Sequence, residues 1–496
     1  MTKLSKANDY IKTNKDNVNP YFRMKYHVMP EIGWMNDPNG FIYYRDKYHL
    51  FYQHYPFDSK WGPIYWGHVA SDDLIKWEYM PIALAPDMYY DVDGCFSGSA
   101  IEKDGKLYIM YTGHTNPDPD NPENIREVQN IAISDDGVNF TKVRQNPVIS
   151  TNDLPSFALP QDFRDPKVFK QDDNYYAVIA SRNIDSSGQV LLYKSKDLLN
   201  WDYVAVVNKS NNKLGKMWEC PDLFKLDDKY IFILSSQYLD SEEYKFNNLF
   251  SSIYMIGDMN FETGSFTHAY IDEIDYGFDF YAPQTLVDNN GRRIMIAWMQ
   301  MWGRTIPTNY KNHKWAGAMT LPRQLKIVNG KLYQLPVDEI TKYRRNYINY
   351  TNVTVYNNIS LQGIEGQNIE LELEIDAQKA NKFGIKVLKG EDEQTIMYYD
   401  RCEGIFAFDR SHSGEKIDNI DDPLENNQVR KTKVLLKNNL LKLRIFIDRI
   451  SVEVFIQDGE RVMSSTVYPK CTSKSIEFFS DDKIIIKNLN KWDINI

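Results

Sequence analysis

The stretch Asp46-Lys47-Tyr48-His49-Leu50-Phe51-Tyr52 contains the pattern that decides the fold, a polar turn followed by a strand rich in aromatic residues. Asp is a common turn residue, and Tyr and Phe favour strands because their rings pack well on a pleated sheet. The pattern recurs at turns that begin with Asp104, Asp172, Asp227 and Asn289. Successive turns are 58, 68, 55 and 62 residues apart, which indicates a repeated β-unit.

A second, independent mark repeats with the same period. In this mark an Asp precedes a Trp or Phe by three or four residues, and the aromatic members are Trp77, Phe140, Trp201 and Phe261. They lie 63, 61 and 60 residues apart. A unit of about 60 residues has room for about four strands, so five units over residues 26–335 predict a five-bladed β-propeller. The alternative is a β-sandwich in which the spacing is accidental.

The pattern changes after residue 335. Residues 336–345 read as a short helical linker, and no long helical period is evident before them. Beyond the linker, Ile369–Ile375 and Leu443–Ile447 alternate apolar and polar residues, as strands with one buried face do. A hairpin turn is expected at Asp448-Arg449. We therefore predict an all-β chain with an N-terminal extension (1–25), a propeller (26–335), the linker and an antiparallel β-sandwich (346–496).

Composition excludes several classes of partner. The net charge is −10 with no basic run, which disfavours nucleic acids and anionic membranes as ligands. No stretch of apolar residues is long enough to span a bilayer. Residues 1–20 are polar and do not resemble a signal peptide, and the four cysteines form no metal motif or disulfide framework. We expect a cytoplasmic protein with no metal or other cofactor, and the sequence leaves homo-oligomer formation open.

Five short segments are expected to meet at one mouth, because the first strand of each propeller blade lines the central channel. They are Asn36-Asp37-Pro38-Asn39-Gly40, Phe96-Ser97-Gly98-Ser99, Arg164-Asp165-Pro166, Glu219-Cys220-Pro221-Asp222 and Tyr281-Ala282-Pro283-Gln284. Pro is tolerated at the first residue of a strand or at an edge, so we place these segments at strand starts. Each acidic residue has a simpler interpretation alone, as a turn former or a surface ion pair.

Taken together, Asp37, Asp165 and Glu219 favour cleavage of a glycosidic bond. Such cleavage needs one carboxylate as nucleophile or base and one carboxylic acid that protonates the leaving oxygen. Glu219 lies between Trp218 and Cys220, so we expect partial burial, which suits a general acid. The sequence contains no HExxH motif, no nucleotide-binding glycine loop and no GxSxG elbow.

The motifs that contain these residues resemble those of a known family. Trp34–Gly40, Phe96–Ser99, Phe163–Pro166 and Trp218–Asp222 are similar to the signatures of glycoside hydrolase family 32, and the resemblance extends to Asp448–Phe455. The family comprises invertases, sucrose-6-phosphate hydrolases and fructan hydrolases. The resemblance implies a five-bladed propeller followed by a β-sandwich, in agreement with the repeat count.

The resemblance also implies residue roles. Asp37 would be the nucleophile, Glu219 the acid and base, and Asp165 the residue that binds fructose hydroxyls and stabilises the transition state. Retention of configuration would require carboxyls of Asp37 and Glu219 about 5–5.5 Å apart. The positions that match the sugar-binding residues of the family are Asn36, Gln53, Trp61, Phe96, Ser97, Arg164, Tyr281 and, near the leaving group, Trp298. Packing is the alternative role for Trp61 and Trp298.

The implied activity is that of a retaining β-fructofuranosidase acting on sucrose and short fructo-oligosaccharides. In the sucrose-6-phosphate branch Trp-Met is usually followed by Gly, whereas here Gln300 and Trp302 follow Trp298-Met299. The segment therefore favours an unphosphorylated substrate, with sucrose-6-phosphate hydrolysis as the alternative. Two further readings stay open: a carbohydrate-binding propeller without catalysis, and transfer of fructose to another sugar.

Overall fold

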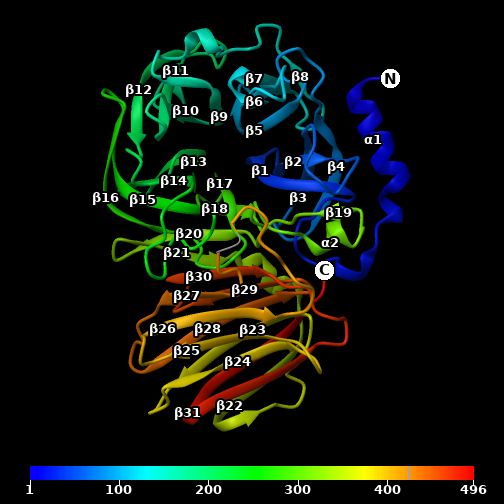
Figure 1. Cartoon of the computed structure of the whole chain (residues 1–496), viewed down its shortest axis with the longest axis vertical. Coiled ribbons are helices and arrows are strands. Elements are labelled where there is room, and N and C mark those ends of the chain that lie inside the picture. Colours follow the sequence, from blue (N-terminus) through cyan, green and yellow to red (C-terminus); the bar gives the residue numbers. More distant parts are fainter. Residues whose placement is uncertain (423–424) are drawn as a thin grey trace.

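The chain folds into a propeller and a sandwich that lie end to end (Figure 1). This computed structural model describes residues 1–422 and 425–496. The expected all-β architecture is confirmed: the propeller has five sheets, and one ten-stranded sheet forms the sandwich. In the described part of the chain, no helix is long and apolar enough to span a bilayer.

Each propeller blade contains four antiparallel strands in chain order. The first blade consists of β1 (Gly33–Tyr44), β2 (Lys47–Tyr55), β3 (Tyr65–Ser71) and β4 (Trp77–Leu84). The second consists of β5 (Gly94–Lys103), β6 (Lys106–Thr115), β7 (Arg126–Ser134) and β8 (Thr141–Lys142). The third consists of β9 (Ala158–Gln171), β10 (Asn174–Asn183), β11 (Gly188–Ser195) and β12 (Asp202–Lys209). The predicted aromatic strands are therefore the second strands of their blades.

The last two blades close the ring. The fourth consists of β13 (Met217–Leu226), β14 (Lys229–Gln237), β15 (Phe250–Asn260) and β16 (Ser265–Glu273), and the fifth of β17 (Tyr281–Val287), β18 (Arg293–Trp298), β20 (Arg323–Val328) and β21 (Lys331–Pro336). Between β18 and β20, the short helix α2 (Pro307–Tyr310) leads to β19 (Trp315–Ala316), which pairs in parallel with β1. The first strands β1, β5, β9, β13 and β17 contact one another around the central axis.

The sandwich is one sheet folded over itself. Its strands are β22 (Arg344–Ile359), β23 (Asn368–Asp376), β24 (Lys382–Lys389), β25 (Gln394–Asp400), β26 (Ile405–His412), β27 (Val429–Lys433), β28 (Leu440–Asp448), β29 (Ser451–Ile456), β30 (Arg461–Thr466) and β31 (Ser475–Ile494). The long strand β31 pairs with β24 near its start and with β23 near its end, so it joins the two layers. The hairpin predicted at Asp448-Arg449 is confirmed, because Asp448 pairs with Ser451.

One helix was not expected from the sequence. Helix α1 (Lys3–Asn14) begins after Thr2, whose side chain caps the backbone N–H of Ser5. Its buried Ala7 and the flanking Leu4 and Ile11 pack against the first blade. The apolar stripe is only one residue wide, which makes its period easy to miss. Short 3₁₀ helices complete the regular structure: Lys15–Asn17, Pro20–Phe22, Pro122–Asn124, Thr151–Asp153 and, where a helical linker was predicted, Asp338–Tyr343.

The two bodies share a buried junction that contains charged residues. His27, from the propeller side, lies between two sandwich carboxylates, with Nδ1 2.8 Å from Asp448 and Nε2 3.0 Å from Glu453. Arg323 of β20 also bonds to Glu453. Hydrogen bonds to Asp448 and Glu453 outweigh the effect of burial and raise the pKa of His27 to about 9. Because every charge has a partner, this junction fixes the sandwich against the propeller.

Candidate active site

The five segments predicted to converge do lie together, each at an irregularity of a first strand. The pairing register shifts between Met35 and Pro38 in β1, and equivalent shifts occur after Phe96 in β5, after Arg164 in β9, after Glu219 in β13 and after Tyr281 in β17. A bulge bends a strand and re-aims its side chains. The repeat thus turns one polar side chain per blade toward the axis.

Pro166, Pro221 and Pro283 lie within these bulges, whereas Pro38 pairs with Tyr52 just after the shift in β1. The segment that begins at Tyr281 lies at a strand start, as predicted, and the other segments lie further inside their strands. A bulged residue has no ladder partner, so Pro166, Pro221 and Pro283 remove no hydrogen bond there. The residues that precede them have left-handed φ angles, for example 62° at Asp165 and 46° at Cys220. Such backbone strain in residues other than Gly is typical of functional sites, where the surrounding packing maintains it.

Asp37 of β1 is buried and held from two sides. Ser97 Oγ donates to its Oδ2 at 2.7 Å, and Asn36 Nδ2 donates to its Oδ1 at 3.2 Å. Gln53 connects the two donors, because it accepts from Asn36 and donates to Ser97. Burial raises the pKa of Asp37 to about 6, against the lowering effect of the Ser97 bond. The carboxyl is therefore fixed in orientation and is ionised at neutral pH.

Glu219 of β13 accepts hydrogen bonds from a guanidinium group and a phenol. Its side chain is 16% exposed, in agreement with the partial burial predicted from the sequence. Arg164 donates to Oε1 from Nε at 3.1 Å and from Nη2 at 2.9 Å. The Tyr281 hydroxyl donates to Oε2 at 2.5 Å. Burial and the charge of Glu219 raise the pKa of Tyr281 well above its usual value, so the phenol stays protonated. Both oxygens of Glu219 are thus oriented.

Asp165 of β9 completes a cluster of three carboxylates. Its Oδ2 accepts from the backbone N–H of Cys220 at 3.0 Å, and the Cys220 thiol lies 3.6 Å from both Asp165 Oδ2 and Asp37 Oδ2. Burial and then the charge of Glu219 raise the pKa of Asp165 well above its usual value. Accumulated negative charge with a single arginine nearby suits the stabilisation of a cation that forms at this point.

These side chains line a cavity of about 280 Å³. The predicted residues Asn36, Asp37, Gln53, Trp61, Phe96, Arg164, Asp165, Glu219 and Tyr281 all border it. Trp61 stands at the rim and is 48% exposed. Trp298 does not border the cavity: it is fully buried behind Trp34 and Trp302, so packing is the role its position shows. Trp302 borders the cavity in its place.

Other residues at the site were not predicted. Cys220 lies within the motif Glu219–Asp222. Gln237 and Phe250 belong to paired strands of the fourth blade, and their position at the cavity becomes evident only once that strand pairing is known. Glu127, fully buried in β7, bonds to Arg164 Nη1 at 3.2 Å and to His114 Nδ1 at 3.2 Å. The ring of His114 in turn stacks on Phe96, with centroids 4.1 Å apart. No local sequence signal identifies Glu127, because its partners come from two blades.

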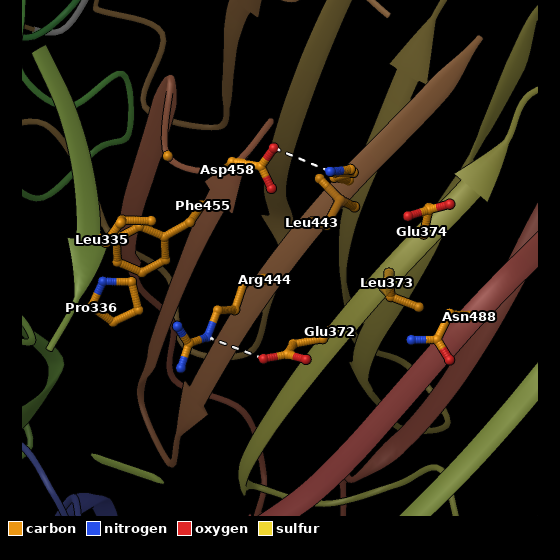
Figure 2. Close-up of a pocket in the computed structure, with 12 residues that line it drawn as sticks. Leu335, Pro336, Glu372, Leu373, Glu374, Leu443, Arg444, Phe455, Asp458 and Asn488 are labelled. Carbon is orange, nitrogen blue, oxygen red and sulfur yellow. Dashed lines mark hydrogen bonds and ion pairs between the residues drawn. The ribbon is translucent and has the colours of Figure 1, made fainter. Parts of the chain in front are cut away.

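A larger cavity of about 350 Å³ lies at the junction with the sandwich (Figure 2). Four of its five charged residues form ion pairs: Arg444 faces Glu372 at 3.7 Å, and Lys442 faces Asp458 at 3.2 Å. Its one aromatic residue, Phe455, is only 2% exposed and offers little surface to a sugar ring. Volume alone therefore does not make it the functional site. Among the residues that the structure describes, no cluster of His, Cys, Asp and Glu has the arrangement of a metal site.

A propeller with three converging carboxylates, aromatic walls and a sugar-sized cavity defines a glycoside-cleaving class of protein. The profile described as "Glycosyl hydrolases family 32 N-terminal domain" matches residues 27–336, and "Glycosyl hydrolases family 32 C terminal" matches residues 339–493. The chain belongs to glycoside hydrolase family 32, and it is a glycoside hydrolase. The family resemblance seen in the motifs is confirmed.

Relatives extend over nearly the whole chain. A sucrose-6-phosphate hydrolase of Escherichia coli is 38% identical over 94% of this chain and 93% of its own length. A raffinose invertase of Escherichia coli is 37% identical over 92% and 91%. Among solved structures, a Bombyx mori β-fructofuranosidase variant in complex with sucrose is 34% identical, with a TM-score of 0.84 and coverage of 99% and 98%. A sucrose-6-phosphate hydrolase from Lactobacillus gasseri is 30% identical, with a TM-score of 0.87 and coverage of 98% and 96%.

Proposed function

We propose that the protein is a retaining β-fructofuranosidase that hydrolyses sucrose and short fructo-oligosaccharides. One observation carries the proposal: a carboxylate fixed by Ser97 and Asn36, that of Asp37, shares a cavity with a carboxyl held by Arg164 and Tyr281, that of Glu219. Two oriented carboxyls that border one sugar-sized space are the machinery of double displacement.

In the first step, an oxygen of Asp37 attacks the anomeric carbon of the fructosyl unit. The bond from that carbon to the glycosidic oxygen breaks, and Glu219 gives its proton to the departing oxygen. Positive charge grows on the sugar ring as the bond breaks. Asp165 accepts hydrogen bonds from ring hydroxyls and stabilises that charge. The products of this step are the free leaving sugar and a fructosyl ester of Asp37.

In the second step, Glu219 takes a proton from water, and the resulting hydroxide oxygen attacks the same carbon. The ester bond to Asp37 breaks and fructose leaves with its original configuration. Arg164 and Tyr281 hold Glu219 through both steps, so the same carboxyl serves first as acid and then as base. Phe96 and Trp61 supply apolar faces for the sugars at the cavity wall and rim.

Sucrose 6-phosphate is the second candidate substrate. The names of the relatives favour it, because they include sucrose-6-phosphate hydrolases as well as an invertase. The charge of the site favours a neutral sugar, since three carboxylates border the cavity with Arg164 already bound to Glu219. We therefore keep the unphosphorylated sugars as the primary proposal.

Three further points belong to the proposal. We divide the chain at residues 25, 335 and 345, because the strands of the fifth blade end at Pro336 and β22 begins at Arg344. A cytoplasmic location is supported by four cysteines without disulfides. Self-association of the chain remains a prediction.

The test is release of fructose from sucrose by the intact protein and by Asp37→Ala and Glu219→Ala. Each variant is expected to lose at least about a thousandfold in kcat, because each removes one participant in bond cleavage. Far-UV circular dichroism checks that the variants fold. NMR of the first product anomer is expected to show retention. Near-normal turnover by both variants, or an inverted anomer, would overturn the mechanism.

A further inference from the structure

A segment of the sandwich reaches the mouth of the active site. Asp421, between β26 and β27, borders the same cavity as the three carboxylates. Its neighbour Ile420 borders an adjoining cavity of about 250 Å³, together with Lys60 and Tyr310. Trp61 and Trp302 line both cavities. The space around the carboxylates therefore continues outward, past two indole rings, along the sandwich segment.

Backbone bonds hold this segment against the propeller. Ile420 N–H donates to the carbonyl of Gly303 at 2.6 Å, and Thr305 N–H donates to the carbonyl of Asp418 at 2.9 Å. The Thr305 hydroxyl accepts from Asp418 N–H at 2.8 Å. There is little space between Gly303 and Asp421: a Cβ added to Gly303 would lie 3.0 Å from an Asp421 carboxylate oxygen. The position of Asp421 relative to the site is thus set by the loop that follows Trp302.

The charge of Asp421 is not cancelled by Arg304, which borders the adjoining cavity. Arg304 is fully buried and already paired with Asp279 and Glu425. Asp421 itself is exposed. Since the fructosyl unit must contact Asp37 and Glu219, the leaving group of the substrate lies toward the mouth. There it meets a carboxylate that accepts hydrogen bonds from sugar hydroxyls and repels a second negative charge.

We propose that Asp421 is a specificity-determining residue that selects a neutral leaving sugar over a phosphorylated one. This inference rests on the proposed function. A phosphate monoester carries nearly two negative charges at pH 7. Repulsion between these two charges and one carboxylate, across several ångströms of water, weakens binding about tenfold. Lys60, exposed at the outer cavity, is the one lysine that borders this space among the described residues, and it offers the opposing attraction.

The experiment compares kcat/KM for sucrose and sucrose 6-phosphate in the wild type, Asp421→Asn, Asp421→Lys and Lys60→Met. Asp418→Asn is the matched control, because Asp418 pairs with Lys416 and borders neither cavity. We expect the wild type to prefer sucrose. The phosphorylated-to-neutral ratio is expected to rise about tenfold in Asp421→Asn and further in Asp421→Lys, mainly through KM. The control is expected to keep the wild-type ratio.

The outcomes separate the two proposals. Added salt is expected to weaken the discrimination of the wild type and to leave that of Asp421→Asn nearly unchanged. If the wild type releases fructose but the ratio stays within twofold in both Asp421 variants, Asp421 does not set specificity. A wild-type preference for sucrose 6-phosphate that disappears in Lys60→Met would overturn the inference in favour of Lys60. If the wild type releases fructose from neither sugar, the proposed function fails first.

Discussion

Replacing Asp37 by Asn is expected to abolish activity and to stabilise the protein at neutral pH. Burial raises the pKa of Asp37 from 3.8 to about 6. This difference corresponds to about 3 kcal/mol by which the folded state is destabilised when the carboxyl is ionised. An amide carries no charge, but it has one acceptor where the carboxylate accepts from both Ser97 and Asn36. Losing one such bond costs about 1 kcal/mol, so we expect a net gain of about 2 kcal/mol.

The sign of the effect makes it testable against pH. Because the pKa of Asp37 is raised in the folded state, its penalty is fully present above about pH 6 and fades as the pH falls toward 3.8. Urea unfolding of wild type and Asp37→Asn, followed by tryptophan fluorescence, is to be compared at pH 7.5 and pH 4.5. We expect the variant to unfold at higher urea at pH 7.5 and to match the wild type at pH 4.5. An unchanged or lower midpoint at pH 7.5, or an equal gain at both pH values, would refute the reasoning.

Two other buried groups are expected to respond with different signs. Burial opposes ionisation of Glu127, but Arg164 and His114 outweigh this effect and lower the pKa of the carboxyl. We therefore expect Glu127→Gln to reduce the free energy of unfolding by about 3 kcal/mol at pH 7, and by less as the pH falls. With sucrose as substrate, the same variant is expected to lower kcat about tenfold with KM little changed, because Arg164 then orients Glu219 less firmly. An unchanged kcat would contradict this role. His27, with its pKa raised to about 9, contributes stability that is complete below pH 6.5 and is lost as the pH rises through 9. Urea midpoints of the wild type should therefore fall between pH 6.5 and 9 more than those of His27→Gln, and parallel curves would exclude this role.

The repeat predicts the fold because packing imposes it. Phe140 and Phe261 each pack between their own blade and the preceding one, Phe140 against Phe51 and Phe261 against Tyr176. They recur at about 60 residues because these contacts between neighbouring blades need the same filling. The convergence of Asp37 and Glu219 follows from the same repeat, since equivalent positions of first strands must meet at the axis. A property that depends on the repeat is thus visible in the sequence alone.

Contacts outside the repeat are not visible in this way. Trp298 matches a sugar-binding position by motif, but the ring lies behind Trp302, and only the path of the loop after β18 decides which indole faces the cavity. Asp421 lies in the sandwich, about 200 residues from Glu219, and reaches the site through pairing with Gly303. No periodicity of the chain encodes that approach, because it depends on how two domains dock.

The bulges explain how one repeat gives five different roles. A regular strand would point alternate side chains into the neighbouring sheets, and a polar group aimed at the axis would interrupt the ladder. Here the interruption occurs at the same place in every first strand, and prolines occupy positions that need no backbone donor. Substitution at a bulge then changes chemistry without changing packing: a carboxylate in β1, β9 and β13, a hydroxyl in β5 and a phenol in β17. Strain in the left-handed residues Asp165, Cys220 and Ala282 is the structural cost of this arrangement, and it falls on a catalytic carboxylate or on residues next to Glu219 and Tyr281 in the chain.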